Sequence, residues 1–587
     1  MPTLSRLAGL LCTVFLIAGC GGGDKPKSKG YSAPTLASKK TLVRGYGASD
    51  TSAGDVKKSY VPTGKILADS NLRPWDDGFN FENYGNDAGP VNMTPAQVED
   101  LFGKQVCYDG TGQSCKLTPA AKQWMDVTND AMAGGHCMGF SVTALRFFTK
   151  NINPSDYGAA KTSALPIVGN NSLQELIAED WAYQKLPLVT DKQITGAPSD
   201  VLKAITTALG DPKKETYTLG ILNKTGGHAI TPFAVEDQGG GKQNVLVYDN
   251  NFPGVVRTVA FDTNQNHWSY HGGPNPSDLN ELYEGDAQNP NIVLLPTTPG
   301  TQLQPCPFCN GSTAAPRGYG TGTALGKSEQ YDEITLTGNP VNHAHLLLTD
   351  KKGNRTGFVN GTIINEIPGA EVNRSLTVQN WREAPEPAYR IPNGIAVEVT
   401  VDATALDKPD TEDLTLIGPG DYFDISGINL KPGQQDTVSF QSGGGGLNYA
   451  TNADLTKAPL ISGGVVHGSG ADQAVYFFNA SAVGVKGLSS LAFIFDQKDG
   501  YFGIDTGGTT GDLAGSGKGL YVLQLIRGTD TTFDTWSNSQ LFLKGGKGET
   551  AIVDYLNAPK DRTKPVDVLI DPNNSDPNRH EQLKPDN

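Results

Sequence analysis

The chain has 587 residues and a formal net charge of −15 at pH 7, from 47 Lys and Arg against 62 Asp and Glu. Nucleic-acid binding needs a clustered basic surface, which this sequence does not have, so we expect no nucleic-acid partner. The length exceeds that of one typical domain and favours about three.

The N-terminus is typical of an exported protein. Residues 1–19 contain one basic residue, Arg6, followed by a mostly apolar run. This run is shorter than the roughly 20 residues that a spanning helix needs, so we expect a signal peptide. Its end, LIAGC, resembles the lipobox of bacterial lipoproteins, which implies cleavage before Cys20 and lipid on Cys20. The alternative is an ordinary signal peptide with an incidental cysteine. We expect an extracytoplasmic protein of the bacterial cell envelope, anchored to a membrane by lipid.

Residues 20–70 are rich in Gly, Ser, Lys and Thr and predict a flexible tether. Helix signals follow in MTPAQVEDLFG and LTPAAKQWMDVTNDAM, where threonine precedes a proline at the first helical position, and in SLQELIAEDWAYQ and PSDVLKAITTALG. Strand signals then dominate in TYTLGILNK, HAITPFAVED, NVLVYDNN, VRTVAFDT and NIVLLPT. A helical half followed by an antiparallel β half predicts an α+β domain over residues 71–300, with any site between the halves.

The rest of the chain is composed mainly of strand and turn signals. Residues 301–330 predict a linker, residues 331–440 a β-sandwich domain, and residues 441–557 a second β-rich domain or an extension of the first. Residues 558–587 are charged and contain proline, which favours a disordered tail. The acids of DQKDGYFGID (496–505) are interpreted as surface-turn residues, with a calcium site as the alternative.

Seven cysteines are present, and Cys12 leaves with the signal peptide. Cys107 and Cys115 enclose a turn-rich loop, and Cys306 and Cys309 form CPFC, so we expect two local disulfides. A redox dithiol is the alternative for CPFC. This pairing leaves Cys137 as an odd free cysteine, which favours a nucleophile over a merely buried thiol.

The sequence around Cys137 predicts a buried helix that begins at this residue. CMGFSVTALRFFTK is apolar on most sides, which is typical of a helix inside a domain. Unpaired backbone N–H groups and the helix dipole favour an anion at such a start, so they stabilise a thiolate. Gly134 and Gly135 permit unusual backbone angles just upstream. His136 has no ligand-spaced partner, so we expect no metal here.

A base and an acid follow in the strand region. His228 begins a predicted strand, and Asp249 ends the next. Adjacent antiparallel strands can bring the two together, so that Asp249 holds the imidazole in one orientation. Asn250 or Asn251 could do the same. HWSYH (267–271) is interpreted as a strand edge that could border the cleft.

The order Cys137, His228, Asp249 and the glycine-flanked GGHCMGFS resemble the papain-like cysteine peptidases, over residues 90–300. Among its branches, the form with aspartate as third member is similar to bacteriocin-processing and related bacterial peptidases. The family usually has a glutamine before the cysteine as an oxyanion donor, but that position is Ala131 here. We expect Asn129 to donate instead, beside the backbone N–H of Cys137.

The combined interpretation is a membrane-anchored thiol hydrolase, a peptidase or amidase, that acts on a peptide or protein by Cys-His-Asp acyl transfer without a cofactor. One alternative is an inactive papain-like binding or adhesion lipoprotein whose β half binds a cell-surface ligand. A transglutaminase-like acyltransferase is the other, although its cysteine and histidine usually lie closer together in sequence.

Overall fold

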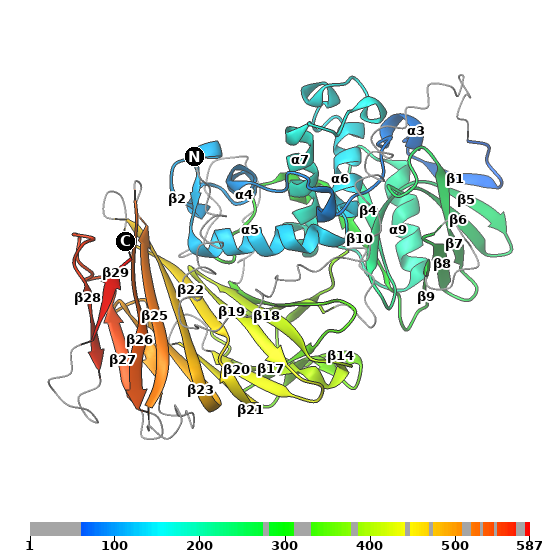
Figure 1. Ribbon diagram of the computed structural model, residues 1–587. Helices are drawn as coiled ribbons and strands as arrows, with labels where there is room; N and C mark the ends of the chain where they lie inside the picture. Colours follow the sequence, from blue (N-terminus) through cyan, green and yellow to red (C-terminus); the bar gives the residue numbers. More distant parts are fainter. Residues whose placement is uncertain are drawn as a thin grey trace, which may run out of the picture. The chain divides into compact units, whose positions relative to one another are not determined.

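The computed structural model describes residues 60–273, 281–309, 330–376, 386–440, 446–468, 473–506, 518–528, 532–544, 549–570 and 581–586 (Figure 1). The predicted signal peptide, Cys20, most of the predicted tether and most of the predicted linker lie outside the described residues.

The longer helices lie where the sequence predicts them. α4 (Pro95–Phe102) begins after Thr94, which forms a capping box with Gln97, and α5 (Pro119–Ala131) begins after Thr118. The other α-helices of the described residues are α3 (Pro74–Asp77), α6 (Cys137–Phe148), α7 (Asn171–Trp181), α8 (Pro187–Thr190) and α9 (Pro198–Gly210). In α6, 10 of the 12 residues are buried. This helix contacts α7 on one side and strands on another, so it lies in the interior, as its composition predicts.

The strands before residue 300 form an eight-stranded sheet in the order β10-β4-β5-β6-β7-β8-β9, with β1 paired to β5. A separate two-stranded sheet joins β2 (Cys107–Asp109) to β3 (Lys116–Leu117). The strands of the larger sheet are β1 (Lys65–Asp69), β4 (Tyr217–Leu222), β5 (Gly227–Gly239), β6 (Lys242–Tyr248), β7 (Val256–Asp262), β8 (His267–His271), β9 (Leu282–Gly285) and β10 (Ile292–Pro296).

The strands after residue 330 form one sheet of 19 strands. They are β11 (Tyr331–Thr337), β12 (His345–Asp350), β13 (Arg355–Val359), β14 (Thr362–Asn365), β15 (Glu371–Asn373), β16 (Ala388–Pro392), β17 (Val397–Asp402), β18 (Asp410–Gly418), β19 (Asp421–Leu430), β20 (Gln435–Phe440), β21 (Leu447–Lys457), β22 (Leu460–His467), β23 (Ala474–Asp496), β24 (Tyr501–Asp505), β25 (Lys518–Gly528), β26 (Phe533–Lys544), β27 (Thr550–Asp554), β28 (Val566–Ile570) and β29 (Glu581–Pro585).

The long strand β23 connects two rows of strands within this sheet. Its first half pairs with β22 and β25, which continue the row that contains β18, β19 and β26. Its second half pairs with β21 and β24, which continue the row that contains β17, β20 and β27. A single hydrophobic cluster extends from Ile334 to Leu583. The two rows therefore share one core.

The predicted fold class, a papain-like α+β domain followed by a β-sandwich-like region, is wrong. The chain is mostly β, with 43% strand against 22% helix, and a papain-like arrangement of a helical half followed by a sheet is not evident in the part described. β1 precedes the helices in sequence yet pairs with β5, and α9 packs against β1, β5 and β10. Residues 331–440 and 441–557 contribute strands to one continuous sheet. β28 and β29 belong to it too, in the segment expected to be a disordered tail.

A buried ion cluster joins the helical region to the large sheet, and both belong to one compact unit. Lys185 Nζ lies 3.0 Å from Glu333 Oε1, and Arg390 Nε lies 3.2 Å from Glu333 Oε2. Arg390 also donates a hydrogen bond to the Lys185 carbonyl oxygen at 2.5 Å. Burial alone would raise the pKa of Glu333. The effect of the two cations is larger and opposite, so the net pKa lies below its usual value and the carboxylate stays charged.

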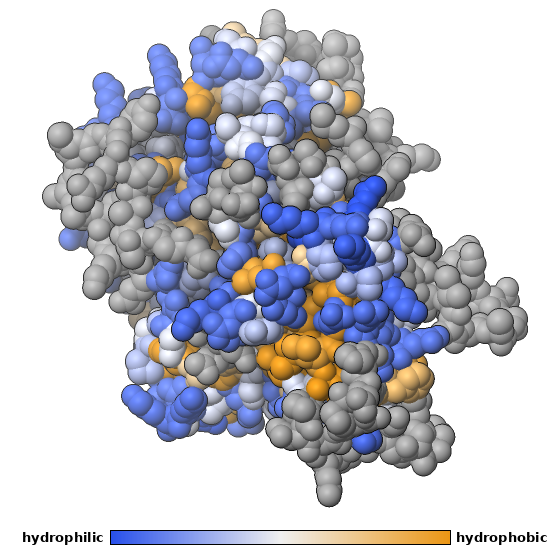
Figure 2. Space-filling view, turned by 90° about the vertical axis from the view of Figure 1, so that its left-hand side faces the viewer, coloured by the Kyte–Doolittle hydropathy of each residue, from blue (hydrophilic) through white to orange (hydrophobic). Residues whose placement is uncertain are grey.

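Figure 2 shows one face of the molecule, on which a patch of hydrophobic residues lies among hydrophilic ones. Exposed large apolar side chains of the C-terminal strands include Phe533, Phe542 and Leu569. Among the helices described, none combines the length and the apolar character that crossing a membrane requires.

Candidate active site

Cys137 is the first residue of α6, as predicted, and it is a free, fully buried cysteine. The turn before it depends on Gly135, whose φ of 136° suits glycine and whose added Cβ would lie 2.7 Å from Asn83 Nδ2. Asn83 Oδ1 accepts a hydrogen bond from the His136 backbone N–H at 2.7 Å. This turn fixes the direction in which α6 begins, and with it the position of the thiol.

His228 and Asp249 meet through two neighbouring strands. β5 contains His228 near its start, and Asp249 directly follows β6, which pairs with β5. His228 Nε2 lies 2.8 Å from Asp249 Oδ1, and both side chains are buried. The Asn251 backbone N–H donates to the same oxygen at 2.8 Å, and the Tyr270 hydroxyl donates to Asp249 Oδ2. The acid is therefore held by three donors.

The electrostatics connect the thiol to this pair. Burial lowers the pKa of His228, but the Asp249 carboxylate and then the Cys137 sulfur raise it, to about 10. Burial raises the pKa of Asp249, but His228 and the other donors lower it, to a net value below the usual one. His228 Nδ1 is buried and has no hydrogen-bond partner within the described part of the chain. The imidazole thus forms its hydrogen bond to Asp249 through Nε2, which leaves Nδ1 available for the nearby sulfur.

The side chain of Asn129 contacts the segment that leads into α4. Its side-chain Nδ2 donates to the Met93 carbonyl oxygen at 3.0 Å, and its Oδ1 accepts from the Met93 N–H at 3.2 Å. The oxygen and the nitrogen of this amide both hold the segment that leads into α4, and a role for Asn129 as oxyanion donor stays a prediction. Backbone N–H groups in the first turn of α6 remain as candidate donors, because they have no partner within the helix.

The neighbouring asparagines have structural contacts of their own. Asn250 Nδ2 donates to the carbonyl oxygens of Cys137 at 3.1 Å and Ala229 at 2.9 Å, which ties the start of α6 to β5. Asn251 Nδ2 lies 3.4 Å from His228 Nε2, farther than Asp249. Asp249 is therefore the main partner of the imidazole.

No protein-family model matches this chain, and neither a curated protein nor a solved structure is detectably similar to it.

Two contacts of the site were missed by sequence reasoning. Tyr270 lies in HWSYH, which we interpret as a strand edge that could border the cleft, but the pattern does not indicate that its hydroxyl contacts Asp249. The Cys137 thiol donates a hydrogen bond to the carbonyl oxygen of Leu376, with 3.6 Å between sulfur and oxygen. Leu376 is 239 residues away in sequence, and no local pattern marks it.

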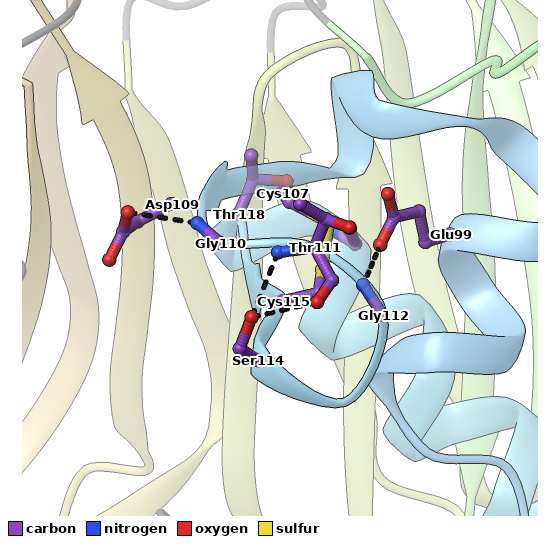
Figure 3. Close-up of a disulfide and its surroundings, with 10 residues drawn as sticks. Glu99, Cys107, Asp109, Gly110, Thr111, Gly112, Ser114, Cys115 and Thr118 are labelled. Atoms are coloured by element: carbon purple, nitrogen blue, oxygen red, sulfur yellow. Dashed lines mark hydrogen bonds between the residues drawn. A yellow bond between two sulfur atoms is a disulfide. The ribbon is translucent and has the colours of Figure 1, made fainter.

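Both predicted disulfides are confirmed, because Cys107 is bonded to Cys115 and Cys306 to Cys309. Figure 3 shows the Cys107–Cys115 loop beside the carboxylate of Glu99, which accepts a hydrogen bond from the Gly112 N–H. The Ser114 hydroxyl donates to the Thr111 carbonyl oxygen within the same loop. The loop is therefore fixed both covalently and by hydrogen bonds.

One cluster outside this site has donor atoms suited to a metal ion. His343, His345 and Glu386 each offer one ligand atom, and these atoms lie within 4.8 Å of one another. His345 Nδ1 lies 2.8 Å from Glu386 Oε2. Imidazole and carboxylate are ligands of Zn²⁺ and similar ions. Sequence reasoning did not single out this cluster, which combines a His-x-His segment with a distant acid.

Proposed function

We propose that the protein is a thiol hydrolase, a peptidase or amidase, in which Cys137 is the nucleophile, His228 the acid and base, and Asp249 the group that orients His228. The observation that supports this most is the imidazole itself. Nε2 of His228 lies 2.8 Å from the buried Asp249 carboxylate, while Nδ1 has no hydrogen-bond partner among the described residues. The nearby Cys137 thiol raises the pKa of this imidazole.

The chemistry is acyl transfer. The Cys137 thiolate attacks the carbon of a carboxamide, and the bond to nitrogen breaks as His228, in the imidazolium form, protonates the departing amine. The resulting thioester is then attacked by water, which transfers a proton to His228, and the acid is released with regeneration of the thiolate and the imidazolium. Helix α6 supplies backbone N–H groups for the oxyanion of each tetrahedral intermediate.

The location that we propose is outside the cytoplasm, at the cell envelope, with lipid on Cys20. The two disulfides support an oxidising compartment. The peptide or protein substrate must reach a thiol that is fully buried.

The burial of the Cys137 thiol also favours a second candidate function, a binding protein in which Cys137, His228 and Asp249 are not catalytic. In that case the large sheet would bind a cell-surface ligand, and Cys137 would be a structural thiol below the surface. The reactivity of Cys137 separates the two functions.

The test is the rate at which iodoacetamide alkylates Cys137 in the purified full chain, measured from pH 5.5 to 9.5 by the mass of the Cys137-containing peptide. An ordinary thiol loses about tenfold in rate per pH unit below its pKa of about 8.5. A thiolate held by imidazolium reacts at a nearly constant rate across this range. We expect the flat profile for the wild type and the ordinary one for His228→Ala.

His267→Ala is the matched control, because His267 is a partly exposed histidine of β8 with an acid neighbour, Glu284, at 3.5 Å. It should leave the profile flat. An ordinary profile in the wild type would exclude the hydrolase and favour the binding protein.

A further inference from the structure

The thiol is covered by a short segment of the large-sheet region. Residues 374–376 directly follow β15, and Leu376 is only 3% exposed. Its carbonyl oxygen accepts the hydrogen bond from Cys137 Sγ at 3.6 Å. Leu376 also belongs to the same hydrophobic cluster as Cys137 and Ala229. The segment therefore lies in the space that a substrate must enter.

The helical and strand regions that surround Cys137 hold this segment at two points. The Leu376 N–H donates to Gln184 Oε1 at 2.6 Å, and the Arg374 guanidinium donates to the Asn223 carbonyl oxygen at 3.1 Å. One bond holds the backbone of the segment through a glutamine side chain, and the other holds an arginine side chain of the segment through a backbone carbonyl oxygen, so the segment is fixed as a bound peptide would be.

The Leu376 side chain occupies a place that two glycines keep open. A Cβ added to Gly220 would lie 2.7 Å from Leu376 Cδ1, and one added to Gly227 would lie 3.1 Å from Leu376 Cα. Leu222 and Val293, also at this place, pack against the same hydrophobic cluster. A larger residue at either glycine would exclude the leucine, so the space is shaped for an aliphatic side chain.

The position of Leu376 prevents Cys137 from reacting with the Leu376 carbonyl group. A sulfur that is hydrogen-bonded to a carbonyl oxygen lies on the oxygen side of the group, whereas nucleophilic attack requires the sulfur above the carbonyl carbon. Leu376 thus fills the position of the residue whose carbonyl would be attacked, without presenting that carbon to the thiolate.

We propose that Arg374–Leu376 is a built-in occupant of the acyl-binding cleft, which keeps Cys137 inactive until it is displaced. The cleft then accepts an extended peptide with a leucine-like residue on the acyl side of the scissile bond. This inference rests on the proposed function, because it assigns the substrate class of the same thiol.

The experiment compares iodoacetamide alkylation of Cys137 in the full chain for the wild type, Leu376→Ala, Arg374→Ala and Val372→Ala. Leu376→Ala should raise the rate roughly tenfold or more, because loss of buried apolar surface shifts the equilibrium toward the displaced segment. Arg374→Ala releases the other anchor and should raise the rate too. Val372→Ala is the control, because Val372 lies in β15 but packs against the core of the large sheet.

Substrate class is tested on the Leu376→Ala protein with two peptidyl chloromethyl ketones that end in leucine or glutamate. The leucine reagent should modify Cys137 at least about tenfold faster, because the space is apolar. Equal rates for the two reagents would overturn the substrate class. Unchanged alkylation in both Leu376→Ala and Arg374→Ala would overturn the covering segment. A wild-type chain found cleaved after Leu376 would also overturn it, since the segment would then be a substrate.

Failure of the proposed function gives a different result. If Leu376→Ala exposes the thiol but the added change His228→Ala leaves its pH profile unaltered, the covering segment is supported and the hydrolase is excluded.

Discussion

Replacement of Asp249 by Asn should flatten the pH dependence of stability. In the wild type the pKa of His228 is raised to about 10, from a usual value near 6.5, because the Asp249 carboxylate outweighs the effect of burial. A raised pKa stabilises the folded state fully below pH 6.5. This stabilisation declines as the pH rises and is lost above about pH 10.

The magnitude follows from proton linkage. Between these limits the folded state binds one proton that the unfolded state does not, so the free energy of unfolding falls by about 1.4 kcal/mol per pH unit. The full loss between pH 6.5 and 10 is roughly 5 kcal/mol. In Asp249→Asn the buried imidazole has no carboxylate partner and stays neutral over this range, so this contribution to the slope disappears.

The assay is urea unfolding at several pH values from 6.5 to 10, followed by tryptophan fluorescence. The buried side chains of Trp124, Trp181 and Trp268 report on the region that contains the site. Other titrating groups are common to both proteins and cancel in the difference between the two curves. Parallel curves for wild type and Asp249→Asn would refute the assignment of a charged His228–Asp249 pair.

Tyr270→Phe removes a hydrogen bond to a buried carboxylate and should lower the free energy of unfolding by about 1.5–3 kcal/mol, measured in the same urea assay; no change would show that the hydroxyl does not support the acid. Glu333→Gln leaves two buried cations without their anion and should lower the free energy of unfolding by about 3–5 kcal/mol. Glu371→Gln alters a half-exposed partner of the same arginine and should lower it by less than about 1 kcal/mol. Equal shifts in melting temperature for the two variants would contradict this effect of burial. Replacing Cys107 and Cys115 together by serine opens a short loop and should cost about 2.5 kcal/mol, and a melting temperature equal to that of the wild type would show that the disulfide contributes nothing.

Local sequence patterns predicted local features well. Thr-Pro pairs marked the starts of α4 and α5, and a glycine pair before an apolar run marked the start of α6 at Cys137. Both disulfides join cysteines that are close in sequence, eight and three residues apart. His228 and Asp249 were predicted to meet because adjacent antiparallel strands place such residues side by side.

Features that depend on distant pairing were not predictable in this way. Alternating strand signals do not reveal whether β20 and β21 belong to two domains or to one sheet, because the partner is fixed by tertiary packing. Nothing in the sequence around Leu376 distinguishes it from other buried leucines, and only the fold brings it to the thiol. The contact between the Asn129 amide and Met93 likewise depends on the fold, and the distance of Asn129 from Cys137 in sequence does not reveal it.

The course of β23 has a practical consequence for anyone who shortens this chain. Because each half of β23 pairs within a different row, a chain that ends before residue 474 would leave β21 and β22 unpaired on one side and open the shared interior to water. A fragment that begins after β23 would lack the strand that pairs with both β24 and β25. Residues 330–586 should therefore be expressed together, and partial digestion should yield either this whole segment or small peptides.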